Sequence, residues 1–547
     1  MMLNRKGSVF SKFLAPLSLL LLIIGCAVQQ KPQGGPRDTQ APKLLKAEPA
    51  NMTKRFSSKE IKLDFDEYFK LTNQFQEFVV FPSPDKIPDY KVRGKSLIIE
   101  LKDTLQKNTT YVINFGKGLV DVNEGNVLKN FTYVFATGDH IDSLSISGTV
   151  TNNTTQLKEK DATVMLFTLK QDSLLFGKKK PSLFTTTDSA GNFTLSNLRE
   201  GMYRIYALKE TAPDKIYNND NDLIAFTSNA INLTKDTSNV ALKLFKQSPT
   251  KLRLVDRKFN QDGSLFFSVN RPLIRPTVKI LYPAGLDAQK ITEFAPTSDT
   301  VNLYSKNMDF DSIQVAFFED GKPVDTTSLR KGRKETFTRN LSFKYGVSIM
   351  SELKPGNDLK LYANLPIETF EQGLITLKED SNNVAFTLTK DTGTTKRYTI
   401  KHRWRQKAKY VLTIGESAFT SIYGDKSKKQ SRTFNIATPE SFSNLNLTMN
   451  VPDSTKSYVV ELLNEQRVPI RRDVITKKTK LSYLNYYVGK FTVRVVYDNN
   501  KNGKWDSGIV AKKSQPENIW VYEKTFTLRP NWETEESIEI PPEVIVP

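Results

Sequence analysis

Hydrophobic and polar positions alternate in short segments along most of the chain. Residues 61–65 read apolar, polar, apolar, polar, apolar, which is the pattern of a strand with one buried face. Similar segments, bounded by Gly, Pro and Asn, follow at 78–81, 97–101, 109–115 and 131–137. Short strands at regular spacing predict a β-sandwich. The fold class predicted for the whole chain is all-β, with elongated tandem sandwiches.

The first block resembles a bacterial Ig-like domain, of the type first described in surface-layer proteins. The matching residues are Ala41-Pro42, the Phe-Asp-Glu of 65–67, the run 105–112 and the Phe-Ala-Thr-Gly of 135–138. The order of strand, turn and strand between 144 and 205 resembles the transthyretin-like sandwich, which occurs as a regulatory-type domain in carboxypeptidases. Both resemblances imply β-sandwich folds, and the second implies a structural module.

The C-terminal part of the chain repeats the N-terminal part. Three segments match at nearly constant offsets: 409–415 with 110–116 (offset 299), 434–438 with 133–137 (offset 301) and 489–493 with 201–205 (offset 288). Two modules recur in the same order, which indicates a decayed tandem duplication of an Ig-like plus transthyretin-like pair. Repeats that contact their neighbours favour an elongated body.

The N-terminus has the pattern of an export signal. Arg5, Lys6 and Lys12 precede an apolar run that is too short to span a bilayer and ends in Gly25-Cys26. This ending resembles a bacterial lipobox, in which the thiol is acylated with palmitate-type chains and the mature protein begins at the cysteine. The resemblance implies a lipid anchor on Cys26 at the outer membrane. Surface-exported lipoproteins often carry an acidic run just after this cysteine, and residues 27–31 have none, so the periplasmic face is favoured over the cell surface. An ordinary signal peptide is the alternative.

The polar residues 27–40 are typical of a flexible tether. Their Gly-Gly-Pro-Arg-Asp run at 34–38, ahead of an Ig-like domain, resembles a family of Bacteroidota lipoproteins. The expected segments are a signal peptide at 1–25, a lipidated tether at 26–40, an Ig-like domain at 41–140, a transthyretin-like sandwich at 141–247, a β-sandwich spacer at 248–345, a second Ig-like copy at 346–440 and a second transthyretin-like copy at 441–547.

The chain is strongly basic, with a formal net charge of +20 over 547 residues. The signal holds three basic residues and no acidic one, so the mature chain keeps +17. This charge indicates contact with an anionic glycan or lipopolysaccharide, and an evenly solvated surface is the alternative. Nucleic acid is not an expected partner, because the protein is exported and its Lys and Arg residues are spread along the chain.

The strongest chemical motif is the segment 498–506, Asp-Asn-Asn-Lys-Asn-Gly-Lys-Trp-Asp. Oxygen side chains at positions one, three, five and nine, with Gly at six, match the start of an EF-hand loop. The predicted ligands of a structural Ca²⁺ are Asp498, Asn500, Asn502, the backbone carbonyl of Lys504, and Asp506. Position twelve is Ile509, where an EF-hand has a bidentate Glu, so the affinity is expected to be modest or the last ligand to come from elsewhere. A cation-free Asn-Gly turn is the alternative.

Residues for catalysis are scarce in this sequence. The chain has two histidines, His140 and His402, and no cysteine besides Cys26, and it lacks a Gly-x-Ser-x-Gly motif. We therefore expect no enzyme activity, and a hydrolase is the weakest of the functional hypotheses. The favoured function is a scaffold or docking lipoprotein with a protein partner in the envelope, as an accessory of an outer-membrane protein complex. The alternative is a glycan-binding surface lipoprotein.

Overall fold

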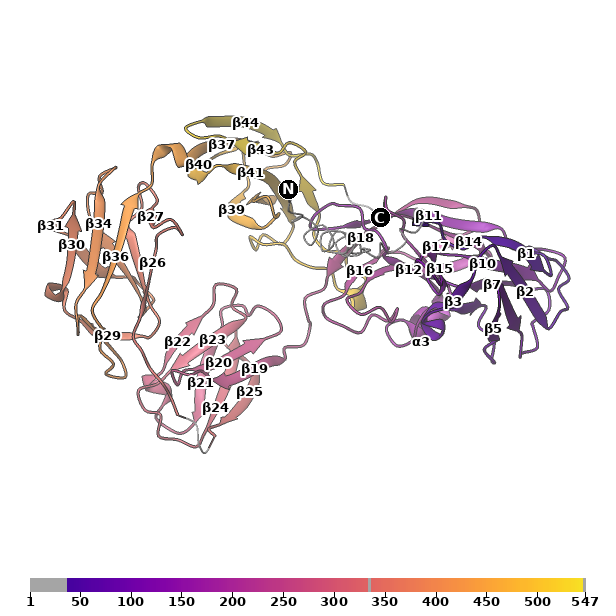
Figure 1. The fold of residues 1–547 in the computed structure, drawn as a ribbon, viewed down its shortest axis with the longest axis horizontal. Coiled ribbons are helices and arrows are strands. Elements are labelled where there is room, and N and C mark those ends of the chain that lie inside the picture. The colour runs from indigo at the N-terminus through magenta and orange to yellow at the C-terminus, as the bar shows by residue number, and fades with distance from the viewer. Residues whose placement is uncertain (1–36, 333–335, 545–547) are drawn as a thin grey trace, which may run out of the picture. The chain divides into compact units, whose positions relative to one another are not determined.

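The computed structural model describes residues 37–332 and 336–544 (Figure 1). The predicted signal and the lipidation residue Cys26 lie outside the described residues. Strands dominate the described chain, and none of its helices is long and apolar enough to cross a membrane. The chain divides into two compact units with the boundary after Ile141.

The first unit is a β-sandwich. Its sheets have the strand orders β1-β2-β6-β5, β10-β7-β4 and β3-β8-β9. Ile61, Leu63 and Phe65 of β2 are buried as the alternation predicts, and they pack in one aromatic-rich core. The elements are β1 (Leu44–Glu48), β2 (Glu60–Phe65), β3 (Phe69–Leu71), α2 (Gln74–Glu77), β4 (Val79–Phe81), β5 (Asp89–Arg93), β6 (Ser96–Glu100), β7 (Thr110–Asn114), β8 (Leu119–Asp121), β9 (Val127–Leu128) and β10 (Thr132–Ala136).

The second unit begins with an eight-stranded arrangement, β13-β12-β15-β16-β18-β11-β14, with β17 added to β15. The helix α3 starts at a capping box, in which the Thr168 side chain accepts from the backbone of Gln171. The elements are β11 (Leu144–Asn152), β12 (Thr163–Thr168), α3 (Leu169–Leu175), β13 (Phe184–Thr186), β14 (Asn192–Leu198), β15 (Gly201–Lys209), β16 (Leu223–Phe226), β17 (Ile231–Leu233) and β18 (Thr237–Lys246).

Two further sheets, β19-β20-β23-β22 and β21-β24-β25, enclose the next core. A hairpin turn at 319–322 joins the last two of these strands, because Glu319 pairs with Lys322 and both Asp320 and Gly321 have positive φ. The elements are β19 (Leu254–Phe259), β20 (Leu265–Val269), β21 (Thr277–Tyr282), η1 (Asp287–Gln289), β22 (Ile291–Phe294), β23 (Thr300–Tyr304), β24 (Ser312–Glu319) and β25 (Lys322–Arg330).

The sheets that follow repeat the first unit. The orders β26-β28-β33-β32 and β36-β34-β30 correspond to β1-β2-β6-β5 and β10-β7-β4. The elements are β26 (Phe343–Tyr345), β27 (Glu352–Leu353), β28 (Leu359–Ala363), β29 (Ile367–Phe370), η2 (Gln372–Leu374), β30 (Ile375–Glu379), β31 (Asn382–Val384), β32 (Thr387–Lys390), β33 (Arg397–Lys401), β34 (Lys409–Ile414), β35 (Phe419–Ser421) and β36 (Gln430–Ile436).

The last sheets, β40-β37-β44 and β39-β38-β41-β42 with β43 added to β41, repeat the order of β14-β11-β18 and β13-β12-β15-β16 with β17. The elements are η3 (Pro439–Ser441), β37 (Phe442–Asn450), β38 (Ser457–Leu463), β39 (Pro469–Ile475), β40 (Thr479–Tyr487), β41 (Gly489–Asp498), η4 (Val510–Lys512), β42 (Ile519–Val521), β43 (Phe526–Leu528) and β44 (Glu533–Glu539).

A shared tyrosine corner supports the duplication of the Ig-like module. The Tyr111 hydroxyl accepts from the backbone N–H five residues upstream at 2.9 Å, and the Tyr410 hydroxyl does the same at 2.7 Å. Tyr111 stacks on Phe135, and Tyr410 stacks on Phe434. In the strand pairing, Phe135 lies opposite Tyr111 and Phe434 lies opposite Tyr410, so Phe434 is equivalent to Phe135. The offset of 301, which aligned Phe434 with Tyr133, is therefore wrong by two residues on this strand.

Gly148 permits a close approach between β11 and β18. A Cβ atom on Gly148 would lie 1.9 Å from the carbonyl oxygen of Val240. We predict that Gly148→Ala lowers the free energy of unfolding of the second unit by about 1–3 kcal/mol, because one strand must move. Urea denaturation checks this, with Gly373→Ala as the control, since a Cβ there meets nothing within 4 Å. Equal stability of the two variants would contradict the close approach.

Candidate functional site

The loop 498–506 follows directly from β41. Asp498 is its first residue and is almost fully buried. Gly503 has a φ of +76°, a left-handed conformation that glycine adopts without strain. The sequence therefore placed the glycine of the turn correctly.

The carboxylate of Asp498 fixes the turn. Its Oδ1 accepts from the backbone N–H of Asn502 at 2.9 Å, and its Oδ2 accepts from the backbone N–H of Gly503 at 2.9 Å. Oδ2 also accepts from the Ser457 hydroxyl at 2.9 Å. A charged acceptor that satisfies three donors stabilises this turn and ties it to β38.

The other predicted ligands gather around the same turn. The side-chain amides of Asn500 and Asn502 both donate to Oδ2 of Asp506 at 2.5 Å. Lys504 contributes a backbone N–H that donates to Oδ1 of Asn502 at 3.0 Å. Within the described ranges, no group of three or more His, Cys, Asp and Glu residues is placed to share a metal ion. Calcium at this loop stays a prediction, beside the cation-free turn.

Glu517 is the functional residue that sequence reasoning missed, since it is eleven residues beyond the motif. Its carboxylate accepts from the backbone N–H groups of Asn499 at 2.8 Å and Asp506 at 3.0 Å, so it joins both ends of the loop. Burial, and then the negative charges of Asp506 and Asp498, raise the pKa of Glu517. A cation at the loop would relieve this repulsion.

The first copy folds its counterpart loop in the same way. Glu210 replaces Asp498, and its Oε1 accepts from the backbone N–H groups of Asp214 at 2.8 Å and Lys215 at 2.9 Å. Lys215 stands at the glycine position and has a φ of +62°. The turn therefore forms in a copy that has lost ligand residues, which identifies the carboxylate–backbone clamp as the shared structural element.

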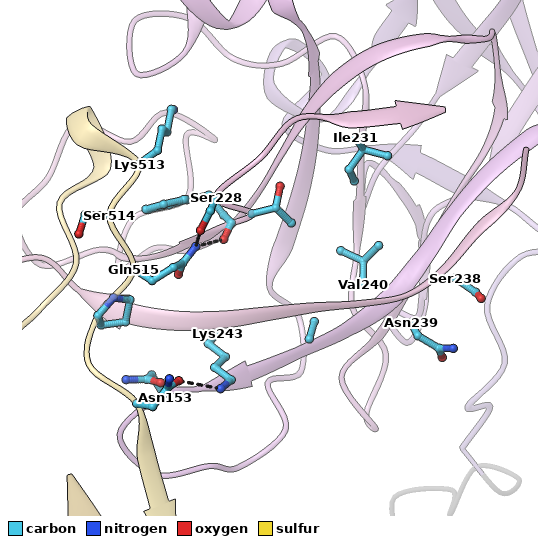
Figure 2. Close-up of a pocket in the computed structure, with 15 residues that line it drawn as sticks. Asn153, Ser228, Ile231, Ser238, Asn239, Val240, Lys243, Lys513, Ser514 and Gln515 are labelled. Carbon is cyan, nitrogen blue, oxygen red and sulfur yellow. Dashed lines mark hydrogen bonds between the residues drawn. The ribbon is translucent and has the colours of Figure 1, made fainter. Parts of the chain in front are cut away.

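The segment 507–518, called the strap below, leaves the loop and lies against the 142–247 sandwich (Figure 2). The backbone N–H of Val510 donates to Oε1 of Gln247 at 2.6 Å, and Nε2 of Gln515 donates to the carbonyl of Phe226 at 2.7 Å. The sequence does not indicate this contact, because more than 250 residues separate the partners.

Two arginines extend the same contact. Arg494 donates to the carbonyl of Thr154 at 3.0 Å, and Arg467 donates to the carbonyl of Thr155 at 2.7 Å. The buried carboxylate of Glu461 accepts from Nε of Arg494 at 2.7 Å and orients the guanidinium. Because this carboxylate is 2% exposed, the pair is shielded from solvent and holds its geometry.

A cavity of about 530 Å³ lies between the strap and the sandwich. Figure 2 shows Gln515 on the strap facing Ser228, with Lys243 below them and Ile231 and Val240 toward the other end. The strap therefore completes one wall of this cavity.

His402 and three of the four tryptophans contact other side chains or the backbone of their modules. His402 contacts the carbonyl of Ala385 at 2.8 Å and the carboxylate of Glu379 at 3.2 Å. Three tryptophans, Trp404, Trp505 and Trp520, pack against cores. Trp532 is 56% exposed and lies next to Arg529. The four tryptophans therefore do not form a shared surface, and glycan binding stays an alternative.

The family comparison agrees with the first unit. Residues 38–137 match the family model of the bacterial Ig-like domain. This match confirms the resemblance seen in the first block. No curated protein matches the sequence.

Solved structures that resemble the chain include three bacterial proteins. The major pilin subunit BcpA of Bacillus cereus is 11% identical, with 73% of this chain and 99% of that chain covered and a TM-score of 0.13. The Bacillus anthracis TIE protein is 8% identical, with 92% and 75% covered and a TM-score of 0.14. The S-layer protein rSbsC(31-844) is 12% identical, with 89% and 67% covered and a TM-score of 0.13. Similarity at this level carries no functional argument.

Calcium at the loop is testable by chelation. If Ca²⁺ binds, saturating Ca²⁺ at one hundred times the dissociation constant stabilises the C-terminal sandwich by about 2.7 kcal/mol, and EGTA removes this gain. Asp506→Asn should abolish the Ca²⁺ dependence, and Asp214→Asn in the first copy should leave it intact. Tryptophan fluorescence during urea unfolding measures both. An unchanged midpoint in EGTA would support the cation-free turn.

Glu210 predicts a pH dependence of stability. Burial raises the pKa of this carboxyl to about 7. Since the folded pKa lies above the unfolded value, the stabilisation is complete below about pH 4.3 and is lost as the pH rises through 7. We expect the unfolding free energy to fall by about 1–2 kcal/mol from pH 5 to 8, after solvent screening, and Glu210→Gln to flatten this slope. Exposed Glu200→Gln is the control, and an unchanged slope in Glu210→Gln would refute the assignment.

Proposed function

We propose that the chain is a non-catalytic lipoprotein of the bacterial cell envelope that serves as a scaffold or docking module. The proposed anchor is acylated Cys26 at the outer membrane, on the periplasmic face. The proposed partner is a protein of an outer-membrane complex. The observation that carries the proposal is the contact between the two transthyretin-like copies, which the strap and two arginines maintain.

The charged side chains of the second unit support a structural role. Glu461 is used to orient Arg494 toward the neighbouring sandwich, and Glu379 is used to hold His402 and Arg405. Side chains that are saturated by permanent hydrogen bonds are poorly suited to proton transfer with a substrate. The same bonds suit a body that presents a fixed surface to a partner.

The composition of the chain supports an envelope location. The tether precedes an Ig-like domain, and the basic net charge favours residence near anionic surfaces. A chain held by acyl groups needs no membrane-spanning element of its own. Scaffold and anchor are therefore consistent with each other.

The proposal predicts the behaviour of Cys26→Ser in cell fractions. The variant should move from the outer-membrane fraction to the soluble fraction and should lose at least tenfold of its co-purifying partner, because the acyl anchor is absent. Gln30→Ser is the matched control and should fractionate like the natural chain. Immunoblots of the fractions and pull-down from detergent extracts measure both effects.

Membrane retention of Cys26→Ser would argue against the anchor. Retention of the purified protein on envelope polysaccharide, without a protein partner, would instead favour the glycan-binding alternative.

A further inference from the structure

The two transthyretin-like copies differ at one edge. This edge is near β17 and β18 in the first copy and near β43 and β44 in the C-terminal copy. The ladders give the equivalence. Val240 pairs with Gly148, and Glu536 pairs with Leu447, at the same position of the neighbouring strand. Ile231 pairs with Tyr203 of β15, and Phe526 pairs with Phe491 of β41, which is the equivalent position at the offset of 288. Ile231 and Phe526 are therefore equivalent as well.

In the C-terminal copy this edge is closed. The Tyr522 hydroxyl donates to Oε1 of Glu536 at 2.9 Å and so bridges the two sheets. The Tyr522 ring also stacks on Phe526 at 6.0 Å and contacts Trp520 at 5.8 Å. Large side chains thus fill the space between the sheets.

In the first copy the same edge is open. Phe226 and Val521 pair at matching positions of β15 and β41, so the residues that follow them, Thr227 and Tyr522, are equivalent. Val240 stands where the C-terminal copy has Glu536, and Ile231 where it has Phe526. The smaller side chains leave the cavity of about 530 Å³, and Figure 2 shows Ile231 and Val240 pointing toward each other across it. This volume lies in the range of about 300–1,000 Å³ that is typical of ligand pockets.

The backbone along this opening has hydrogen-bonding capacity. β16 and β18 pair only through two residue pairs, at Leu223 and Ile224 of β16. Beyond them β16 and β18 no longer pair. Along 238–243, within the described residues, the edge of β18 that faces away from β11 borders the cavity. An exposed strand edge of this kind can accept an extended segment of another chain.

The polar end of the cavity is cationic. Lys243 donates to Oδ1 of Asn518 at 3.2 Å, which leaves two of its three ammonium protons for other acceptors. No Asp or Glu lines the cavity, and no described carboxylate forms an ion pair with Lys243. Burial lowers the pKa of Lys243, and the nearby carboxylate of Glu543, which pairs with Lys456, offsets only part of this effect. An incoming carboxylate would offset more of it.

The same end holds an unpaired acceptor. Asn153 is fully buried, its Nδ2 donates to the carbonyl of Glu517 at 3.2 Å, and its Oδ1 has no hydrogen-bond partner. An unsatisfied buried acceptor is costly, and it invites a donor from a ligand. The cavity therefore offers a cation, an acceptor in need of an N–H group, and an apolar end.

We propose that this cavity binds the C-terminal residues of a partner protein that ends in an apolar side chain. The terminal carboxylate would face Lys243, a backbone N–H would donate to Oδ1 of Asn153, and the apolar side chain would lie between Ile231 and Val240. This inference names the docking site of the function proposed above. The two proposals fail separately, because peptide binding is measured on the purified chain and partner capture on membranes.

Fluorescence anisotropy with labelled hexapeptides tests the proposal. A Gly/Ser peptide that ends in Phe with a free carboxylate should bind the full chain at least tenfold more tightly than its C-terminal amide and than a peptide that ends in Lys. Equal binding of acid and amide would overturn the proposal. Competition by octanoate as strong as that of the free-acid peptide would also overturn it, because a fatty acid would then be the better ligand.

Lys243→Gln and a double variant locate the site, with Lys246→Gln as the control. Lys243→Gln should weaken the free-acid peptide at least tenfold, and Lys246→Gln should not, since Lys246 is on the same strand but contacts Asn221. The double variant Thr227→Tyr with Val240→Gln copies the bridge of the C-terminal copy without adding charge and should abolish binding. Thermal melting confirms that both variants fold. Unchanged affinity in a folded double variant would refute the cavity as the site.

Discussion

The carboxylate of Glu517 is the point on which the arrangement of the second unit depends. It accepts backbone N–H groups from both ends of the 498–506 loop, and its own backbone carbonyl accepts from Trp505 at 2.9 Å and from Asn153. One residue thus links the loop, the strap and the neighbouring sandwich. The position of the strap follows from it, and the strap supplies one wall of the cavity. The loop and the cavity wall therefore share one anchoring residue.

Much of the fold follows from local sequence patterns. Alternation in 61–65 and the turn at Asp320-Gly321 each specify their structure within a few residues, because burial of one strand face and positive φ are local requirements. The duplication was also readable, and a two-residue register error arose only where similar aromatic residues, Tyr133 and Phe135, both fit the alignment. Hydrogen-bonded pairing across strands resolves that ambiguity, which composition cannot.

The candidate site was only partly predictable. The loop was found because its ligand spacing is local, and Gly503 marks its turn. Glu517 and the contacts to Phe226 and Gln247 depend on how distant segments meet, and no periodicity encodes that. The cavity was invisible for a different reason. It arises because Thr227 and Val240 are smaller than the equivalent residues of the second copy, Tyr522 and Glu536. Neither residue indicates a cavity until the two copies are compared.

Duplication gives this comparison its physical meaning. The copies share strand order and the carboxylate clamp on the turn, so the backbone alone does not decide whether the edge is open. Side-chain volume at equivalent positions decides it, and close packing means that smaller residues without a compensating shift leave a void. Apolar walls that face solvent cost stability, and the half-buried Lys243 beside them is partly desolvated. A copy that keeps both features, while its twin is filled and bridged by Tyr522 and Glu536, is better explained by a ligand than by imperfect packing.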